Sequence, residues 1–463
     1  MNASEESCIY IEGTVDYNKR MGMKRFLKAI AVVLCAAVCG SILLFSACAP
    51  EKPPEEETEP PAYTLMPALA VESGEVRNDA GERVTLRGVN AGGLFVTEHW
   101  MTGFQYGKTP SNDYRSLTLT FLERFGEEKT KRLWETYREN WWTAADFQRC
   151  ADMGMNVIRL PFTYMNIDFP AIEDLDAAGQ EYDFSAIEAF VNEAAEYGLY
   201  TILDLHGAYG SQNGQDHSGQ IFETADEVTF YSNEQLMSLT VKLWEQLALH
   251  FKDNPAVAGY DILNEPGEKA GQTSERHWAF FDRVYEAIRG TGDQHIIIFE
   301  SCWDGRNLPQ PDEYGWENCM YSFHHYAGDS IGYDSYCRSW DNKLRDAESQ
   351  NFGVPLYMGE FTNYESPERW DYVLDLLNTS GWHWTSWTYK VWGNMAWGVV
   401  NVPNVAENKV DASSDSYEEI LEKFSHLQTE NCTEHTFEDS STLEDIFKQH
   451  LRSADLPQAG AAD

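Results

Sequence analysis

A CxxC motif is missing from this 463-residue sequence, although one disulfide among its cysteines is possible. Three of its nine cysteines, Cys8, Cys35 and Cys39, lie in an N-terminal region that we expect to be removed, and Cys48 ends that region. The other five show no paired spacing, and their odd number leaves at least one free thiol; they are Cys150, Cys302, Cys319, Cys337 and Cys432. The sequence therefore gives no support for a zinc or redox motif, and we expect neither a metal nor a cofactor.

Basic residues are also few, with 34 Lys+Arg against 75 Asp+Glu and a formal net charge of −41. Such a surface repels phosphate backbones, which excludes nucleic acid as a partner. It is compatible with a neutral substrate, although solubility is the simpler explanation of the acidity. The sequence has no internal repeat of solenoid length. Aromatic residues, by contrast, are abundant, and the 15 tryptophans suit sugar binding as well as a core, because a pyranose packs its apolar face on an indole ring.

The N-terminus has the pattern of a secretory signal. Basic residues at Lys24, Arg25 and Lys28 precede an apolar run over 29–47, and small residues stand directly before Cys48. This ending resembles a bacterial lipobox, in which the cysteine is lipidated. The alternative is an uncleaved signal-anchor, because the run is just long enough to span a bilayer. Both interpretations place the rest of the chain outside the cytoplasm, with the membrane reached only through this N-terminal anchor.

Two further regions, 1–20 and 49–71, flank this signal. Residues 1–20 fit neither interpretation, so we expect translation to begin at Met21 or Met23. Residues 49–71 are rich in Pro and Glu, which predicts an extended linker that holds the folded part away from the membrane.

Residues 72–430 alternate short apolar runs with amphipathic stretches such as 239–251, which predicts βα units closed into a single (β/α)₈ TIM barrel of α/β class. Residues 431–463 are expected to form a C-terminal helix and a polar tail, and we expect a monomer. The eight predicted strands are 84–90, 156–161, 200–206, 257–264, 295–301, 320–326, 355–361 and 382–387.

Nearly every predicted strand carries a polar or aromatic residue near its end. These residues are Asn90, Arg159, His206, Asn264 with Glu265, His324 with Tyr326, Glu360 and Trp387. A lone histidine or arginine of this kind is usually a satisfied structural group. Several at the C-terminal ends of barrel strands indicate a catalytic mouth, because the barrel core itself is filled by apolar side chains.

The motifs Asn264-Glu265-Pro266 and Gly359-Glu360-Phe361, in this order and at the ends of the fourth and seventh predicted strands, resemble those of glycoside hydrolase family 5. Within that family, the exo-β-1,3-glucanase type is the nearest likeness. It rests on 86–93 with Glu98 and Trp100, on 141–162, and on the distinctive segment 204–219, which departs from the eukaryotic glucanases at Tyr209.

The resemblance implies a retaining mechanism, in which two carboxyls about 5–5.5 Å apart act as nucleophile and proton donor. It assigns these roles to Glu360 and Glu265. Arg159 and Tyr326 would support the charge of Glu360, and Asn264 would bind the sugar 2-OH. The remaining substrate contacts that it implies are His206, His324, Glu98 and Trp387, the last as the floor of the −1 subsite.

The resemblance implies a β-glucan or β-glucoside as substrate and hydrolysis in the manner of a glucan exo-1,3-β-glucosidase. Two long segments, 91–142 and 207–232, should surround the mouth, and if they close one end of the cleft, only a chain terminus can enter. Endo-β-1,4-glucanase or β-glucosidase activity on glycosides or glycolipids is the alternative. A non-catalytic sugar-binding surface lipoprotein would share the signal, the linker and the aromatics, but it has no need of the paired carboxylates.

Overall fold

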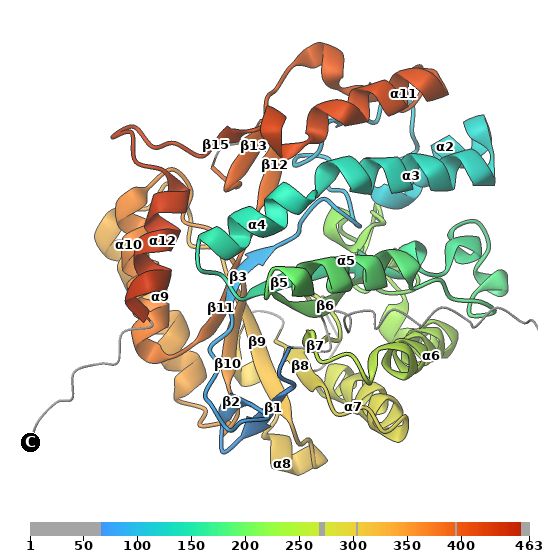
Figure 1. Cartoon of the computed structure of the whole chain (residues 1–463). Helices are drawn as coiled ribbons and strands as arrows, with labels where there is room; N and C mark the ends of the chain where they lie inside the picture. Colours follow the sequence, from blue (N-terminus) through green and yellow to red (C-terminus); the bar gives the residue numbers. More distant parts are fainter. Residues whose placement is uncertain (1–65, 268–273, 302–303, 394–395, 455–463) are drawn as a thin grey trace, which may run out of the picture. The chain divides into compact units, whose positions relative to one another are not determined.

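The computed structural model describes residues 66–267, 274–301, 304–393 and 396–454. Eight parallel strands close into a barrel in chain order, with the last strand paired to the first (Figure 1). This confirms the predicted (β/α)₈ fold, and each predicted strand overlaps an observed one. The barrel strands are β3 (Arg87–Asn90), β5 (Val157–Thr163), β6 (Tyr200–Gly207), β7 (Val257–Asp261), β8 (Ile296–Glu300), β9 (Cys319–His325), β10 (Leu356–Phe361) and β11 (His383–Ser386).

A hairpin of two short strands, β1 (Leu69–Glu72) and β2 (Glu75–Asn78), lies at the N-terminal end of the barrel (Figure 1). Its buried Leu69 and Val76 pack in one apolar cluster with barrel residues such as Val157, Ile202 and Ile298. β1 therefore takes in the last three residues of the expected linker, 69–71, because Leu69 packs into this end of the barrel.

Helices cover the outside of the barrel. They are α4 (Ala144–Asp152), α5 (Ser185–Glu196), α6 (Glu234–Phe251), α7 (Ser274–Gly290), α8 (Pro311–Tyr314), α9 (Tyr333–Glu348) and α10 (Pro367–Ser380). In α6, Leu236, Leu243, Leu247 and Phe251 recur at helical spacing and are buried. The helix starts at the side chain of Asn233, which accepts hydrogen bonds from two free backbone N–H groups.

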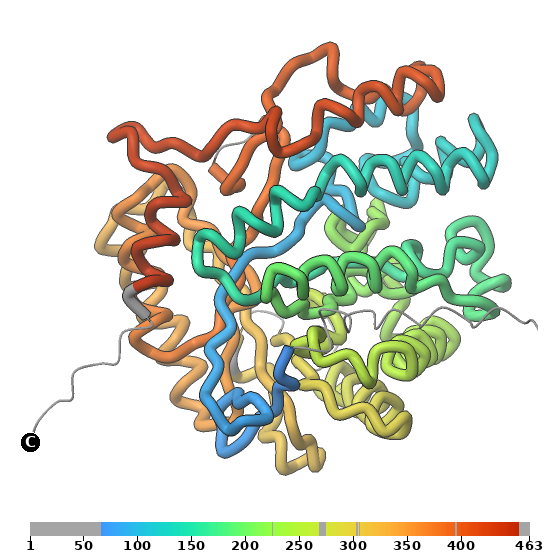
Figure 2. The backbone as a smooth tube through the Cα atoms, in the orientation of Figure 1, coloured from blue at the N-terminus to red at the C-terminus, as the bar shows by residue number. Residues whose placement is uncertain are grey.

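Further elements come from the segments at the C-terminal side of the barrel. They are β4 (Phe104–Gln105), α2 (Tyr114–Phe125), α3 (Glu127–Trp141), β12 (Lys390–Trp392), β13 (Val400–Val402), β14 (Val410–Asp411), α11 (Tyr417–Phe424), β15 (Thr433–Glu434) and α12 (Leu443–Ala454). The tube view shows the late segment with α11 beside α3, far apart in sequence (Figure 2). Beyond residue 430, β15 pairs with β13 and α12 packs against α10, so this stretch is attached to the barrel.

Lys390 joins several of these added elements from a fully buried position. Its ammonium lies 3.0 Å from a carboxylate oxygen of Asp146 and donates to the carbonyl of Trp141 at 2.6 Å and to the hydroxyl of Thr429 at 2.8 Å. A buried cation needs such partners, because leaving it unpaired would cost several kcal/mol, on the order of the desolvation of one ion.

Cys48 and the apolar run before it lie outside the described residues. Within the described ranges, no helix has the length and apolarity needed to span a bilayer. Cys150, Cys319, Cys337 and Cys432 are free thiols, and Cys302 lies outside the described ranges.

Candidate active site

The C-terminal ends of the barrel strands surround a cavity of about 430 Å³. Predicted residues that line it are Glu98, His206, Asn264, Glu265, Tyr326, Glu360 and Trp387, and Trp100, His217 and Trp397 complete the lining. The other two predicted residues, Arg159 and His324, are buried and contact its carboxylates. The fold therefore brings together all nine barrel residues predicted for the site.

Glu360 is held by two donors. The Arg159 guanidinium donates to its Oε1 at 2.8 Å, and the Tyr326 hydroxyl donates to its Oε2 at 2.7 Å. Burial raises the pKa of Glu360, and the charge of Arg159 opposes that rise. The two donors leave this carboxylate oriented and its negative charge compensated.

Arg159 has no exposed surface and serves other acceptors as well. Its Nε donates to Asp261 at 2.9 Å, its Nη2 donates to the side-chain oxygen of Asn264 at 2.9 Å, and Asp204 lies 3.1 Å away. Burial raises the pKa of both aspartates to about 7, although Arg159 lowers it. Asn90 also accepts from this guanidinium, at 3.0 Å. One buried cation thus contacts polar groups from four other barrel strands, β3, β6, β7 and β10, and from the loop after β7.

Glu265 stands in a different environment. Its backbone has a positive φ of 38°, unusual for a residue with a side chain, and its N–H donates to Glu300 at 2.9 Å. Its Oε1 lies 3.0 Å from Nδ1 of His324, and its Oε2 lies 3.3 Å from Nε2 of His217. Burial and the charge of Glu360 raise the pKa of Glu265 well above its ordinary value, as a proton donor requires.

The two glutamates meet at one nitrogen of His324. Its Nδ1 is 3.0 Å from Glu265 Oε1 and 3.5 Å from Glu360 Oε2. Those two oxygens are therefore no farther apart than the sum of these distances, about 6.5 Å, where carboxyl separations of inverting enzymes begin. The separation of about 5–5.5 Å expected for retention fits within this limit.

His206 and Trp387 form one wall of the cavity. Their rings stack with centroids 5.3 Å apart and an angle of 4° between the planes. Nδ1 of His206 lies 2.6 Å from Asp204, and burial lowers the pKa of His206 to about 3. The imidazole is therefore neutral, and with Nδ1–H donated to the aspartate its Nε2 is left as an acceptor for a hydroxyl.

Asn264 and Glu98 offer further polar atoms to the cavity. Among the described residues, the buried amide nitrogen of Asn264 has no hydrogen-bond partner, so it is a donor open to a ligand. Glu98 accepts from the indole N–H of Trp100 at 2.7 Å. Burial and the nearby charge of Asp216 raise the pKa of Glu98 well above its ordinary value.

Sequence reasoning missed His217, Glu300 and Trp397. Glu300 is the last residue of β8, so the rule that found the other strand-end residues applied to it as well. His217 and Trp397 lie in long connections without a periodic signal. Within the described ranges, His217 also belongs to one of two clusters that could hold a cation, Glu98–Asp216–His217 and Glu265–Glu300–His324. Both clusters are part of this polar network, and we assign neither to a metal.

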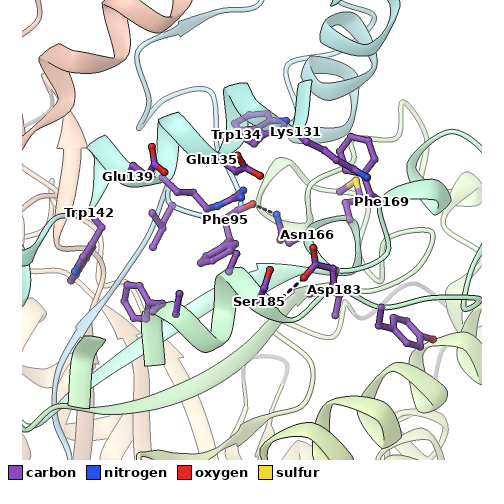
Figure 3. A pocket seen from close by; sticks show the side chains of 18 of the residues that line it. Phe95, Lys131, Trp134, Glu135, Glu139, Trp142, Asn166, Phe169, Asp183 and Ser185 are labelled. Atoms are coloured by element: carbon purple, nitrogen blue, oxygen red, sulfur yellow. Dashed lines mark hydrogen bonds between the residues drawn. The ribbon is translucent and has the colours of Figure 1, made fainter. Parts of the chain in front are cut away.

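A larger cavity of about 810 Å³ lies between α3 and α5, outside the barrel (Figure 3). Side chains of Trp134, Glu135 and Glu139 reach it from α3, while Phe95 lies at its centre and Asp183 on the opposite side. None of the residues predicted for catalysis or binding lines it. The smaller cavity, which holds the two facing carboxylates, is therefore the candidate active site.

Comparison with known proteins decides the family. The model of the family described as Cellulase (glycosyl hydrolase family 5) matches residues 123–393. The chain belongs to glycoside hydrolase family 5. As a member of that family the protein is a glycoside hydrolase, which confirms both the expected family and the expected class of enzyme.

Two relatives of this family 5 protein are each 28% identical to it. Beta-xylosidase of Phanerodontia chrysosporium is 28% identical over 354 residues, 70% of this chain and 71% of that protein. Glucan 1,3-beta-glucosidase of Pichia angusta is 28% identical over 247 residues, 52% of this chain and 54% of that protein. The chain thus matches little more than half the length of the latter.

Among solved structures, an endogalactoceramidase superposes with a TM-score of 0.54 and 22% identity, over 78% of this chain and 85% of that chain. At this identity the likeness shows the shared barrel fold alone.

Proposed function

We propose that this family 5 enzyme hydrolyses β-glucosidic bonds of β-glucans from the chain end, with retention, in the manner of a glucan exo-1,3-β-glucosidase. The observation that carries the proposal is that Glu265 and Glu360 face the same nitrogen of His324, while only Glu360 is bonded to Arg159. Two carboxyls in unequal environments are what an acid and a nucleophile require.

In the first step, a carboxylate oxygen of Glu360 attacks the anomeric carbon. Glu265 gives its proton to the glycosidic oxygen as that bond breaks, and the aglycone leaves as an alcohol. Arg159 and Tyr326 orient the attacking carboxylate. The products of this step are a glycosyl ester on Glu360 and an ionised Glu265.

In the second step, Glu265 acts as a base. It takes a proton from a water molecule, whose oxygen attacks the anomeric carbon and displaces Glu360. This restores the protonated acid and the ionised nucleophile and releases a sugar with the original β configuration.

The cavity walls would position the sugar in the −1 subsite. The free amide N–H of Asn264 would bind the 2-OH, and Trp387 would support the apolar face of the ring. Nε2 of His206 would accept from a neighbouring hydroxyl. Glu98 would bind hydroxyls at the far, non-reducing end of the sugar.

Contacts between the segments that follow β3 and β6 support attack at the chain end. Asp113 accepts from the backbone N–H of Ile221 at 2.9 Å, and Asp216 lies 3.0 Å from His99. The backbone N–H of Arg115 also donates to the carbonyl of Gly219 at 2.9 Å. Both segments line the cavity, through Glu98 and Trp100 and through His217. We infer that together they form an end wall that admits only a chain terminus.

The product time course on a reduced, unbranched β-glucan tests this proposal. Early release of glucose with little fall in viscosity is the expected result. A ladder of oligosaccharides in the first minutes would overturn the exo assignment and favour the endo-β-1,4-glucanase alternative. Rates on laminarin, pustulan, carboxymethylcellulose, aryl glucosides and aryl xylosides would fix the linkage and the sugar.

We also propose that the mature protein is extracellular and tethered to the outer face of the cell membrane through a lipid on Cys48. The signal-like sequence before this residue and the acidic linker after it support the assignment. Wild type should partition with membranes, and Cys48→Ser should release the protein or block its processing. Wild type found free in the medium would overturn the lipid anchor.

A further inference from the structure

The two glutamates proposed for catalysis are attached to the barrel in different ways. Glu360 belongs to β10 and pairs in register with His324 of β9, so hydrogen bonds of the sheet fix its backbone. Glu265 lies four residues beyond Asp261, the last residue of β7, and among the described strands no pairing extends to it. Because a proton donor must be held in one position, the backbone of Glu265 needs support from other groups.

The backbone of Glu265 has one free donor and an unusual conformation. Its φ of 38° lies in the left-handed region that residues with a side chain seldom adopt. The next residue, Pro266, has no N–H. Within the part of the chain that the structure describes, the N–H of Glu265 makes one hydrogen bond, to Oε2 of Glu300 at 2.9 Å. Losing this bond would leave the donor unpaired and the unusual conformation without support.

Glu300 is fixed by the barrel itself. It is the last residue of β8, is 1% exposed, and pairs in register with Ser322 of β9. Burial and the charge of Asp261 raise the pKa of Glu300 well above its ordinary value. The bond to Glu265 does not depend on that pKa, because Oε2 keeps a lone pair for an N–H whether the carboxyl is ionised or protonated.

No other described group takes this acceptor from Glu265. Nη2 of Arg159 is 4.0 Å from Oε2 of Glu300, beyond hydrogen-bond distance. Nδ1 of His324 lies 3.5 Å from the other oxygen, Oε1, and is nearer to the carboxyl of Glu265, at 3.0 Å. Oε1 of Glu300 is left without a hydrogen-bond partner among the described residues. The hydrogen bonding of Glu300 is therefore directed to the backbone of Glu265.

The peptide groups at Glu265 are held from two sides. Asn213, in the segment after β6, donates to the carbonyl of Glu265 at 3.1 Å. That contact comes from a long connection, whereas Glu300 belongs to a barrel strand. Glu300 therefore ties the backbone of Glu265 to the same sheet that carries Glu360.

We propose that Glu300 is a positioning residue for the acid/base: its Oε2 holds the backbone N–H of Glu265 and so keeps the carboxyl of Glu265 beside His324. This inference rests on the proposed function of Glu265. Glu300 is not among the residues that line the cavity, so it acts through Glu265 and takes no proton from the sugar. Without the bond, the carboxyl of Glu265 shifts from the glycosidic oxygen and proton transfer slows.

The test compares Glu300→Met with Glu300→Gln. Both variants are uncharged and close to glutamate in size, but only glutamine offers an oxygen that accepts from the N–H of Glu265. In the Met variant, kcat/KM on a phenyl glucoside should fall about tenfold to a hundredfold more than on a dinitrophenyl glucoside. Only the poor leaving group needs the proton, and a displacement of about 1 Å is costly. The Gln variant should keep the wild-type ratio of the two rates.

Glu300→Asp separates position from charge and serves if the Met variant does not fold. It keeps the carboxyl but withdraws it by about 1.5 Å, the length of one C–C bond. The Asp variant should therefore show the selective loss on the phenyl glucoside, although it keeps the charge that the Gln variant lacks. The reverse order, with a selective loss in Gln and none in Asp, would assign the effect to charge and overturn the inference.

Asp293→Leu is the matched control, because Asp293 is also a buried carboxyl that accepts from a backbone N–H, that of His295 at 2.7 Å. Asp293 precedes β8, at the opposite end of the barrel from the cavity. The control should lower the free energy of unfolding and leave the ratio of rates on the two glucosides unchanged. A changed ratio in this control, or the wild-type ratio in Glu300→Met, would overturn the inference.

Glu265→Ala, measured in the same assays, separates this inference from the proposed function. A selective loss on the phenyl glucoside in Glu265→Ala but not in Glu300→Met would reject the positioning role alone. Equal losses on both glucosides in Glu265→Ala would reject the proton donor, and the positioning role with it.

Crystal structures of the Met and Gln variants give a readout that is independent of activity. In Glu300→Met, Oε1 of Glu265 should lie beyond about 3.5 Å from Nδ1 of His324, whereas Glu300→Gln should keep the 3.0 Å contact. A carboxyl of Glu265 that stays in place in the Met variant would overturn the inference, whatever sugar the enzyme cleaves.

Discussion

Arg159 and Glu360 are joined by a 2.8 Å hydrogen bond between a guanidinium and a carboxylate that both lie below the surface of the protein. The same guanidinium bonds Asp261 and Asn264, so it cannot turn away from the site without leaving buried acceptors unpaired. A buried ion pair of this kind orients its members more than it stabilises the fold. The orientation of Glu360 is thus tied to the barrel interior.

Replacing Arg159 should change both the pKa of Glu360 and the free energy of unfolding of the protein. In Arg159→Gln the positive charge that opposes the pKa rise of Glu360 is lost, so this pKa increases further. The nucleophile must be ionised, and the acid limb of kcat/KM should therefore move to higher pH while the maximal rate falls. Unpaired buried carboxylates should also reduce the free energy of unfolding by about 3–5 kcal/mol. Urea titration and a pH profile measure the two effects, and an acid limb that does not move would contradict the assignment of Glu360.

Glu265→Ala should distinguish the role of proton donor from the role of nucleophile. Its kcat/KM on a glucoside with a poor leaving group should fall by about 10²–10⁴-fold, the usual contribution of a general acid, and much less on a dinitrophenyl glucoside. Added azide should then yield a β-glucosyl azide, since no base is left to activate water. The alkaline limb of the wild-type bell-shaped profile should disappear as well. Equal losses on both substrates, or a flat wild-type profile from about pH 4 to 9, would reject Glu265 as the proton donor.

The stereochemical outcome tests the geometry of the pair directly. The facing oxygens of the two carboxyls are at most about 6.5 Å apart, at or below the lower end of the separations by which inverting enzymes fit a water between the base and the sugar. Proton NMR of the first product should therefore show the β-anomer before mutarotation. First appearance of the α-anomer would show inversion and require a wider separation in solution.

Lys390→Met should destabilise the protein without altering the cavity. The change leaves the carboxylate of Asp146 buried without its cation, at an expected cost of about 3–5 kcal/mol in the free energy of unfolding. Lys131→Met is the matched control, because the ion pair of Lys131 with Glu127 is half exposed and the loss should be much smaller. KM of the folded Lys390 variant should match wild type. Equal stability of the two variants would contradict the structural role of Lys390.

Patterns local to the chain predicted most of the fold and much of the site. Each barrel strand is a short apolar run, and the polar residue that ends it marks the mouth, as for His206 and Glu360. The three-stranded sheet of β12, β13 and β15 was not predicted, because strands of two or three residues carry no periodic signal and depend on tertiary pairing. His217 was missed for a similar reason: its proximity to Glu265 results from amide contacts between two connections, and sequence spacing does not encode such contacts.

The proposed end wall and the proposed catalytic pair occupy different parts of the sequence. The wall comes from the segments after β3 and β6, whereas Glu265 follows β7 and Glu360 stands at the end of β10. In evolutionary terms these are separate targets for mutation. Shortening either wall segment would open the groove for internal attack and leave the bond-breaking residues untouched, so descendants of one ancestral barrel can diverge in how they enter a polysaccharide while inheriting the same chemistry.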